Sequence, residues 1–354
     1  MMSDQQRTAE HWAKPWELDS GLYWTDLAAV RQRLNCKVSD NEAEDWLSYT
    51  LRRHFINKLP LARCYSLGCG HGEIERQLAG LGAFDQCEAS DLSEGAVAEA
   101  RRAATAAGLT NITYEARDAN VLILPVQTYD AIWAHASIHH FDQLEHVFAT
   151  VAEALKPEGL FIMHEYVGAN RFQFSARQCQ VIEACLNLLP VQYRQLPIPA
   201  TSTVETTSMV LNTHREMTWY AQRTWDKLRE GAFWSTIGRY WRRRKAIGSG
   251  QRPIKETALP TLRSVIAIDP SEAVRSAEIM PVLETMFDVI EYRPLGGTIL
   301  QFLLANIAGN FQDDMGKQLL EVLFHLEDTL MACGDIPSDF AYIVARPRAR
   351  DIAG

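Results

Sequence analysis

The sequence lacks a cysteine pattern, a long apolar run and an excess of positive charge. Its seven cysteines include no Cys-x-x-Cys pair, so they indicate neither a disulfide framework nor a zinc site, and no metal is expected. No apolar run approaches the roughly 18 residues of a membrane span, and the polar first residues are unlike a signal peptide, so we expect a cytoplasmic protein. The net charge of −9 opposes general affinity for nucleic acid, and no DNA partner is expected.

The most informative stretch of the chain is CYSLGCGHGE, residues 64–73. An apolar run typical of a buried strand ends in glycines at alternate positions, Gly68, Gly70 and Gly72, and a helix-spaced apolar stripe follows. The dinucleotide fingerprint would require its third glycine at position 73, where Glu73 stands, and no Gly-Lys-Ser/Thr follows to make a phosphate loop. The stretch therefore predicts a strand, a tight turn and a helix that serve neither NAD nor a nucleoside triphosphate.

The sequence GCGHG after a short apolar strand resembles the first motif of class I S-adenosylmethionine-dependent methyltransferases, in particular small-molecule enzymes of the type 11 and type 12 groups. The resemblance implies an α/β, Rossmann-like fold: a seven-stranded, mostly parallel sheet with helices on both faces and a largely helical inserted cap. It also implies S-adenosylmethionine as cofactor, S-adenosylhomocysteine as product, and methyl transfer to an oxygen or nitrogen of a small-molecule acceptor. The cofactor would lie along Gly68, Cys69, Gly70, His71 and Gly72.

Acidic residues follow the next two predicted strands. Asp91 ends a strand over residues 86–90, nineteen residues after Gly72, where a carboxylate can accept hydrogen bonds from the two ribose hydroxyls; Leu92 lies beside it. Its alternative role is a charge at a helix N-terminus. Asp118 and Ala119 follow a strand over residues 112–115, where the resemblance implies contact with the adenine amino group; a surface turn is the alternative for Asp118.

Histidines gather after the fourth and fifth predicted strands, residues 129–135 and 160–166. The resemblance places Ala134 and His135 along the cofactor. A base is needed if the acceptor is a hydroxyl or a protonated amine, and the candidates are His139 and His140 first, then His135. A histidine satisfied by a backbone carbonyl is the alternative for each. The acceptor would be bound by a neighbouring set of residues: His164, Glu165, Tyr166 and Arg171.

The rest of the chain divides around this core. We expect an N-terminal helical segment over the cofactor site (1–60), the nucleotide-binding core (61–189), a cap forming an acceptor-site lid (190–265), and the completion of the sheet (266–354) with a helical insertion at 298–332. Asp269 and Glu272 are expected near the start of a helix before the sixth strand. A basic, aromatic stretch at 223–255 fits a solvated helix face, an anionic substrate or a membrane surface.

Two other functions stay open from the sequence. A noncatalytic protein of the same fold would bind the cofactor or a protein partner without transferring a methyl group. An RNA methyltransferase is disfavoured, because the Asn/Asp-Pro-Pro-aromatic motif of base-amino enzymes is replaced by residues 135–138, His-Ala-Ser-Ile. The sequence determines neither the acceptor nor whether the chain is a monomer or a homodimer.

Overall fold

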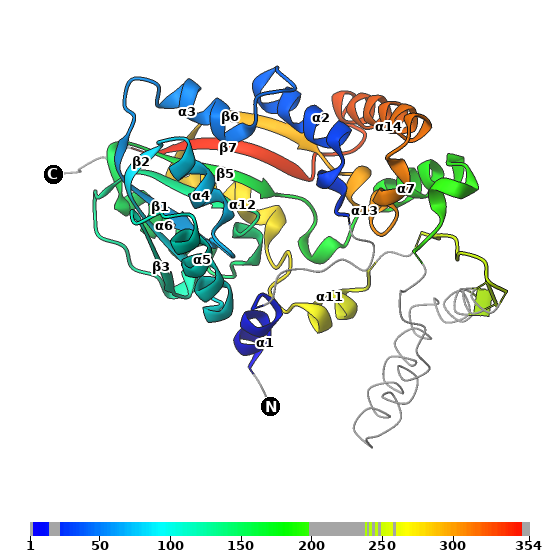
Figure 1. The fold of residues 1–354 in the computed structure, drawn as a ribbon, viewed down its shortest axis with the longest axis horizontal. Coiled ribbons are helices and arrows are strands. Elements are labelled where there is room, and N and C mark those ends of the chain that lie inside the picture. The colour runs from blue at the N-terminus through cyan, green and yellow to red at the C-terminus, as the bar shows by residue number, and fades with distance from the viewer. Residues whose placement is uncertain are drawn as a thin grey trace.

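The computed structural model describes residues 3–13, 22–197, 238, 241–242, 245–246, 249–257 and 260–348. Its centre is a seven-stranded sheet in the order β3-β2-β1-β4-β5-β7-β6 (Figure 1). The strands are β1 (Leu61–Leu67), β2 (Phe84–Asp91), β3 (Ile112–Ala116), β4 (Tyr129–His135), β5 (Leu155–Tyr166), β6 (Phe287–Gly296) and β7 (Phe340–Pro347). The first five pair in parallel, and β7 runs antiparallel to both of its neighbours. The predicted α/β, Rossmann-like fold with a mostly parallel sheet is confirmed.

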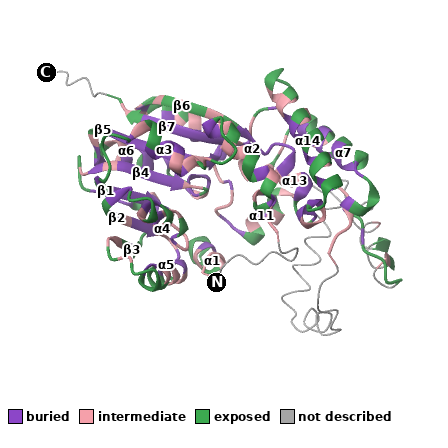
Figure 2. Ribbon diagram, turned by 45° about the horizontal axis from the view of Figure 1, so that its top comes forward, coloured by how far each residue is buried: buried purple, intermediate pink, exposed green. Residues whose placement is uncertain are grey.

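Helices cover both faces of the sheet. The helices of the described residues, including those beyond the sheet, are α1 (Asp4–His11), α2 (Ala28–Ser39), α3 (Trp46–His54), α4 (Glu73–Gly80), α5 (Glu94–Ala106), α6 (Leu144–Ala154), α7 (Ala176–Leu188), α11 (Leu262–Ile268), α12 (Ile279–Met286), α13 (Leu300–Leu304) and α14 (Asp314–Ala332). Apolar side chains of α6 and α12 form one core with the sheet, and those of α3 and α4 form another. Both cores require strands that are apolar on each side, which explains the continuous apolar runs in the sequence. Figure 2 shows these strands as largely buried.

A third apolar core lies beyond the sheet, where α7, α13 and α14 gather (Figures 1 and 2). Helices α13 and α14 occupy the connection between β6 and β7. The carboxylate of Glu327 in α14 is fully buried and accepts hydrogen bonds from the backbone N–H groups of Gly297 and Ile299, while Arg33 of α2 pairs with it at 2.7 Å. This ion pair joins the N-terminal region to the late helices.

One predicted boundary is wrong. The fifth strand was expected to begin at Leu160, but β5 begins at Leu155. Tyr129 pairs with Leu155, and the register then shifts so that Ala131 pairs with Leu160. The extra residues form an irregularity within the strand, since one strand contributes more residues than its partner over the same length.

The chain order creates a crevice at the carboxyl ends of β1 and β4. From β1 the chain moves outward through β2 and β3, and it then returns to place β4 on the other side of β1. Open α/β sheets bind ligands at such a switch point. The glycine turn after β1 and the histidine-containing turn after β4 therefore lie side by side.

Most of the expected cap at 190–265, and most of the basic stretch at 223–255, lies outside the described residues. Among the residues that are described, no helix combines the length and the apolar character needed to cross a membrane.

Candidate active site

The three glycines after β1 meet two different requirements. All have positive φ, +65° at Gly68, +51° at Gly70 and +74° at Gly72, a region that favours glycine. A Cβ on Gly68 would lie 2.4 Å from Cβ of Ser137, and one on Gly72 would lie 2.7 Å from Oη of Tyr114. A Cβ on Gly70 would meet nothing within 4 Å. Gly68 and Gly72 therefore permit close packing, whereas Gly70 leaves open space.

That open space belongs to a cavity of about 660 Å³, within the range of small-molecule sites. Among the predicted site residues, those that line the cavity are Gly68, Cys69, Gly70, His71, Asp91, Leu92, Asp118, Ala119, His135, His140 and Arg171. The predicted residues that do not line it are Gly72, Ala134, His139, His164, Glu165 and Tyr166. The cavity also has a lining that the sequence did not predict in detail, made by Thr8 of α1, by Trp12 immediately after that helix, and by Pro270 and Ser271 after α11.

Asp91 ties the glycine turn to the end of β2. Its Oδ2 accepts a hydrogen bond from the backbone N–H of Gly70 at 2.9 Å, and its Oδ1 accepts one from Ser93 at 2.8 Å. Burial raises the pKa of this carboxyl above its ordinary value, although both N–H groups stabilise the charged form. Each oxygen keeps a lone pair, so the carboxylate can still accept hydrogen bonds from a bound hydroxyl in the cavity.

Asp118 caps the short turn after β3 and also holds α1. Its Oδ1 accepts from the backbone N–H of Asn120 at 2.9 Å, and its Oδ2 accepts from Nε2 of Gln5 at 2.9 Å. Both oxygens therefore have partners in addition to their position on the cavity wall.

Helix α1 lies across the cavity and contacts both of its ends. At one end Gln5 binds Asp118; at the other, Thr8 Oγ1 and Trp12 Nε1 donate to the carboxylate of Asp269 at 3.1 and 2.9 Å. The Trp12 ring packs edge-on against His140, with ring centroids 5.2 Å apart. The helix therefore covers the space between the glycine turn and the histidines.

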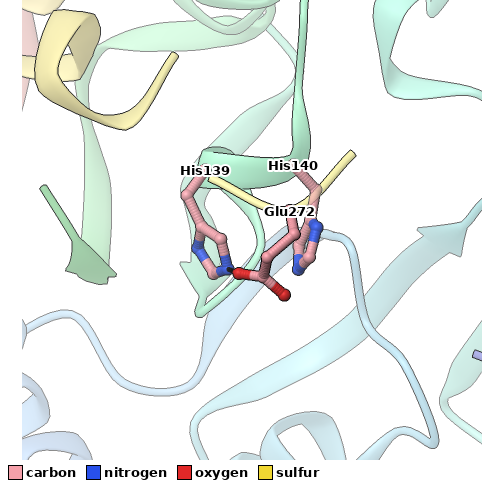
Figure 3. Close-up of side chains that lie close together, drawn as sticks. All are labelled: His139, His140 and Glu272. Atoms are coloured by element: carbon pink, nitrogen blue, oxygen red, sulfur yellow. Dashed lines mark ion pairs between the residues drawn. The ribbon is translucent and has the colours of Figure 1, made fainter. Parts of the chain in front are cut away.

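His139, His140 and Glu272 form what we call the histidine cluster (Figure 3). The two histidines belong to the 3-10 turn η3 (Ile138–His140) after β4, and Glu272 belongs to the loop after α11. Figure 3 shows the Glu272 carboxylate between the two imidazole rings. His139 Nε2 lies 3.6 Å from a Glu272 oxygen, and the two rings lie 4.2 Å apart between centroids.

A buried carboxylate orients His139. Glu165, on β5, has no exposed surface; its Oε1 lies 2.5 Å from His139 Nδ1, and its Oε2 accepts from the backbone N–H groups of Ser137 and Ile138. Burial alone raises the pKa of Glu165, but His139 and these N–H groups outweigh burial and lower the pKa below its ordinary value, so the carboxylate form is favoured. Burial alone lowers the pKa of His139, but the charge of Glu165 raises it above its ordinary value.

His140 has a different environment. Its Nδ1 lies 3.0 Å from Ser271 Oγ, and Ser271 Oγ donates to Asp269 at 2.8 Å. Burial lowers the pKa of His140 to about 3, with the neighbouring His139 charge adding to the effect. Although His140 Nδ1 also lies 3.5 Å from an Asp269 oxygen, burial and the His139 charge outweigh that carboxylate. The pKa values of the two adjacent histidines are therefore shifted in opposite directions.

Strained backbone surrounds the cluster. Seven non-glycine residues in the described ranges have positive φ, and four of them lie here: Ala136, Arg171, Phe172 and Ala273. The backbone N–H of Arg171 donates to the carbonyl of Ala273, and that of Val274, the next residue, donates to the carbonyl of His139. Such conformations cost about 1–3 kcal/mol each and concentrate at functional sites. They fix the relative positions of the turn after β4 and the loop that carries Glu272.

The remaining predicted residues contribute to packing in this structure. His164 lies beside His135 and under Trp46, and burial lowers its pKa to about 3. Tyr166 is buried and donates to the carbonyl of Ala169. The sequence predicted that Asp269 and Glu272 lie near the start of a helix, and this prediction is wrong. Asp269 caps the C-terminus of α11, and both residues face η3. The sequence signal that could have marked them is a pair of acidic residues around a proline, which is too common to be specific.

Comparison with known proteins identifies the core. Residues 65–159 match the model of a methyltransferase domain family. The chain is 26% identical over 149 residues to 27-O-demethylrifamycin SV methyltransferase of Amycolatopsis mediterranei (strain S699), covering 41% of this chain and 50% of the relative. It is 28% identical over 148 residues to malonyl-(acyl-carrier protein) O-methyltransferase of Bacillus anthracis, covering 42% and 52%. The chain thus spans about half the length of the curated relatives it matches.

Among solved structures, an S-adenosylmethionine-dependent methyltransferase from Mesorhizobium loti is similar over 85% of this chain and 98% of its own, with 17% identity and a TM-score of 0.41. The family match and the sheet order confirm the resemblance drawn from the glycine turn. Residues 65–159 thus match a methyltransferase domain, and they lie in the mostly parallel sheet expected of the class I, S-adenosylmethionine-dependent kind.

Proposed function

We propose, from the premise that residues 65–159 form an S-adenosylmethionine-dependent methyltransferase domain, that this chain transfers a methyl group to an oxygen or nitrogen of a small-molecule acceptor. One observation carries the proposal: a single cavity joins the open side of Gly70 and the carboxylate of Asp91 to His140 of the histidine cluster. A cofactor site and an acceptor site must adjoin in this way for direct transfer.

The residues fit the cofactor. A cradle without side chains at Gly70, a buried carboxylate at Asp91 for the ribose, and a wall formed by Leu92 and Ala119 suit an adenosyl group. In this proposal Asp118 lies at the adenine end, and the cavity residues Cys69, His71 and His135 lie toward the methionine end. When bound, the cofactor supplies a methyl group activated on a positively charged sulfur.

The chain's own residues position the reactants, shield the cavity from solvent and supply a proton acceptor. Helix α1 forms part of the cavity wall and reduces the contact of the cavity with solvent, which strengthens electrostatic interactions inside. With Nδ1 of His139 held by Glu165 and Nδ1 of His140 held by Ser271, the Nε2 lone pairs can receive a proton from the acceptor. Glu165 therefore acts through His139, and Arg171, on the cavity wall, is proposed to contact the acceptor.

The charge of the cavity wall favours a small acceptor over a nucleic acid. Its charged lining comprises six carboxylates, Asp4, Glu73, Glu75, Asp91, Asp118 and Asp142, and two guanidinium groups, Arg117 and Arg171. A polyphosphate strand would meet net negative charge along this surface, whereas a sulfonium or a neutral acceptor would not.

The test is transfer of an isotopically labelled methyl group from S-adenosylmethionine into fractionated metabolite pools. We expect label in one class of small molecule, and slower transfer in His139→Ala and His140→Ala with little change in cofactor affinity. Cofactor binding without transfer to any fraction would contradict catalysis and favour the noncatalytic alternative.

A further inference from the structure

The histidine cluster has the composition of a metal site. One nitrogen from each of His139 and His140 and one carboxylate oxygen of Glu272 lie within 4.8 Å of one another (Figure 3). The 3.6 Å separation of His139 Nε2 from Glu272 Oε1 is close to the about 3.3 Å that two ligands of a tetrahedral zinc ion would show at their usual bond lengths. Two imidazoles and a carboxylate are a ligand set found in catalytic zinc and non-haem iron sites.

The outer hydrogen bonds prepare both imidazoles to bind a cation. Glu165 accepts the Nδ1 proton of His139. Ser271 donates its own proton to Asp269, so its oxygen must accept from Nδ1–H of His140. Both histidines then carry the lone pair on Nε2, the arrangement that supporting carboxylates and hydroxyls give to metal-binding histidines.

The charge around the cluster is unbalanced without a cation. Glu165 and Asp269 are 0% and 1% exposed, and Glu272 adds a third carboxylate with 22% of its side chain exposed. The guanidinium of Arg171 donates to the backbone carbonyls of Pro270 and Glu272. Even with His139 protonated beside Glu165, three carboxylates face two positive charges, and a divalent cation would offset the cost of burying the remaining negative charge.

We propose that the histidine cluster binds a divalent transition-metal cation of the zinc type through His139, His140 and Glu272, with Glu165 and Ser271 as positioning residues. This departs from the expectation of no metal. His140 lines the cavity, so a position of the cation left free by the three ligands would face the acceptor. Resting on the proposed function, this deepens it for a hydroxyl acceptor. The acceptor oxygen would bind the cation, which would lower the pKa of the hydroxyl so that its proton leaves to solvent. A second lone pair of that oxygen would attack the methyl carbon while the carbon–sulfur bond of the cofactor breaks, and the histidines would hold the cation instead of taking the proton.

The experiment is titration of metal-stripped, tag-free protein with Co²⁺, followed by its visible absorption and by calorimetry, with Zn²⁺ as competitor. We expect one equivalent to bind the wild type, and at least about tenfold weaker binding in Glu272→Gln and His140→Gln. His325→Gln, on the exposed surface of α14, is the matched control and should bind like the wild type.

Near-ultraviolet circular dichroism and S-adenosylhomocysteine affinity show whether each variant is folded. The metal site is overturned if the wild type and Glu272→Gln bind Co²⁺ with equal affinity. It is also overturned if the wild type binds Co²⁺ no more tightly than the double variant His140→Gln with Glu272→Gln, which lacks both ligands. The cofactor measurement is independent of the metal measurement. Binding of Co²⁺ without binding of S-adenosylhomocysteine would overturn the proposed function and leave the metal site. Binding of S-adenosylhomocysteine without binding of Co²⁺ would overturn the metal site and leave the proposed function.

Discussion

Replacing Gly70 by alanine separates cofactor space from backbone strain. Gly70 and Gly82 both have positive φ, +51° and +67°, and a Cβ on either would meet no atom within 4 Å. Each alanine should therefore lower the free energy of unfolding by the same about 1–2 kcal/mol, the cost of a left-handed L-residue. Only Gly70 lines the cavity. Gly70→Ala should also weaken S-adenosylhomocysteine binding by at least about tenfold, about 1.4 kcal/mol, while Gly82→Ala should not.

Gly72→Ala is the third variant of this comparison, in which the added Cβ clashes with neighbouring atoms. Its Cβ would lie 2.7 Å from Oη of Tyr114 and 2.8 Å from Cβ of Ala100, so overpacking adds about 1–3 kcal/mol to the same strain. Urea unfolding should give Gly82→Ala and Gly70→Ala the same free energy of unfolding and Gly72→Ala the lowest. Calorimetry measures the affinity of each variant for S-adenosylhomocysteine. Wild-type affinity in Gly70→Ala, or equal loss in Gly82→Ala, would refute the reasoning.

Three further predictions concern the carboxylates and α1. Asp91→Asn leaves one of the two backbone N–H groups, of Gly70 or Ser93, facing an amide NH₂ that cannot accept its hydrogen bond. Calorimetry should therefore show at least about tenfold weaker binding of S-adenosylhomocysteine, and unchanged affinity would exclude the ribose role. Trp12→Phe keeps the ring against His140 but removes the hydrogen bond to Asp269, so amide exchange in α1 should accelerate by about tenfold, and unchanged exchange would mean that α1 is held elsewhere. Burial raises the pKa of Glu75 from 4.5 to about 7, so the folded state binds more protons between these values and stability falls as pH rises through them, by up to about 3 kcal/mol. Glu75→Gln should unfold in urea with less difference between pH 5 and pH 8, and an undiminished difference would contradict this assignment.

The sequence was sufficient for the core because its signals are local. The glycine turn, the apolar strands and the position of Asp91 each depend on residues close together in the chain, and the sheet order confirms the fold they predict. The boundary of β5 failed because the pairing partner of Leu155 is Tyr129, and local residues do not determine that register.

The details of the site depend on contacts between distant segments. Glu272 reaches His139 from 133 positions away, and Thr8 reaches Asp269 from 261. Glu165 was expected to bind the acceptor, but in a strand buried on both faces the sequence does not say which face a polar residue takes. Its buried position makes it a support for His139.

The most direct test of the central claim is a crystal structure of the chain with S-adenosylhomocysteine. The account predicts the ligand along Gly68 to Gly72, with its ribose hydroxyls on Asp91 and its sulfur directed toward His140. A ligand bound elsewhere, or a ribose without contact to Asp91, would contradict it.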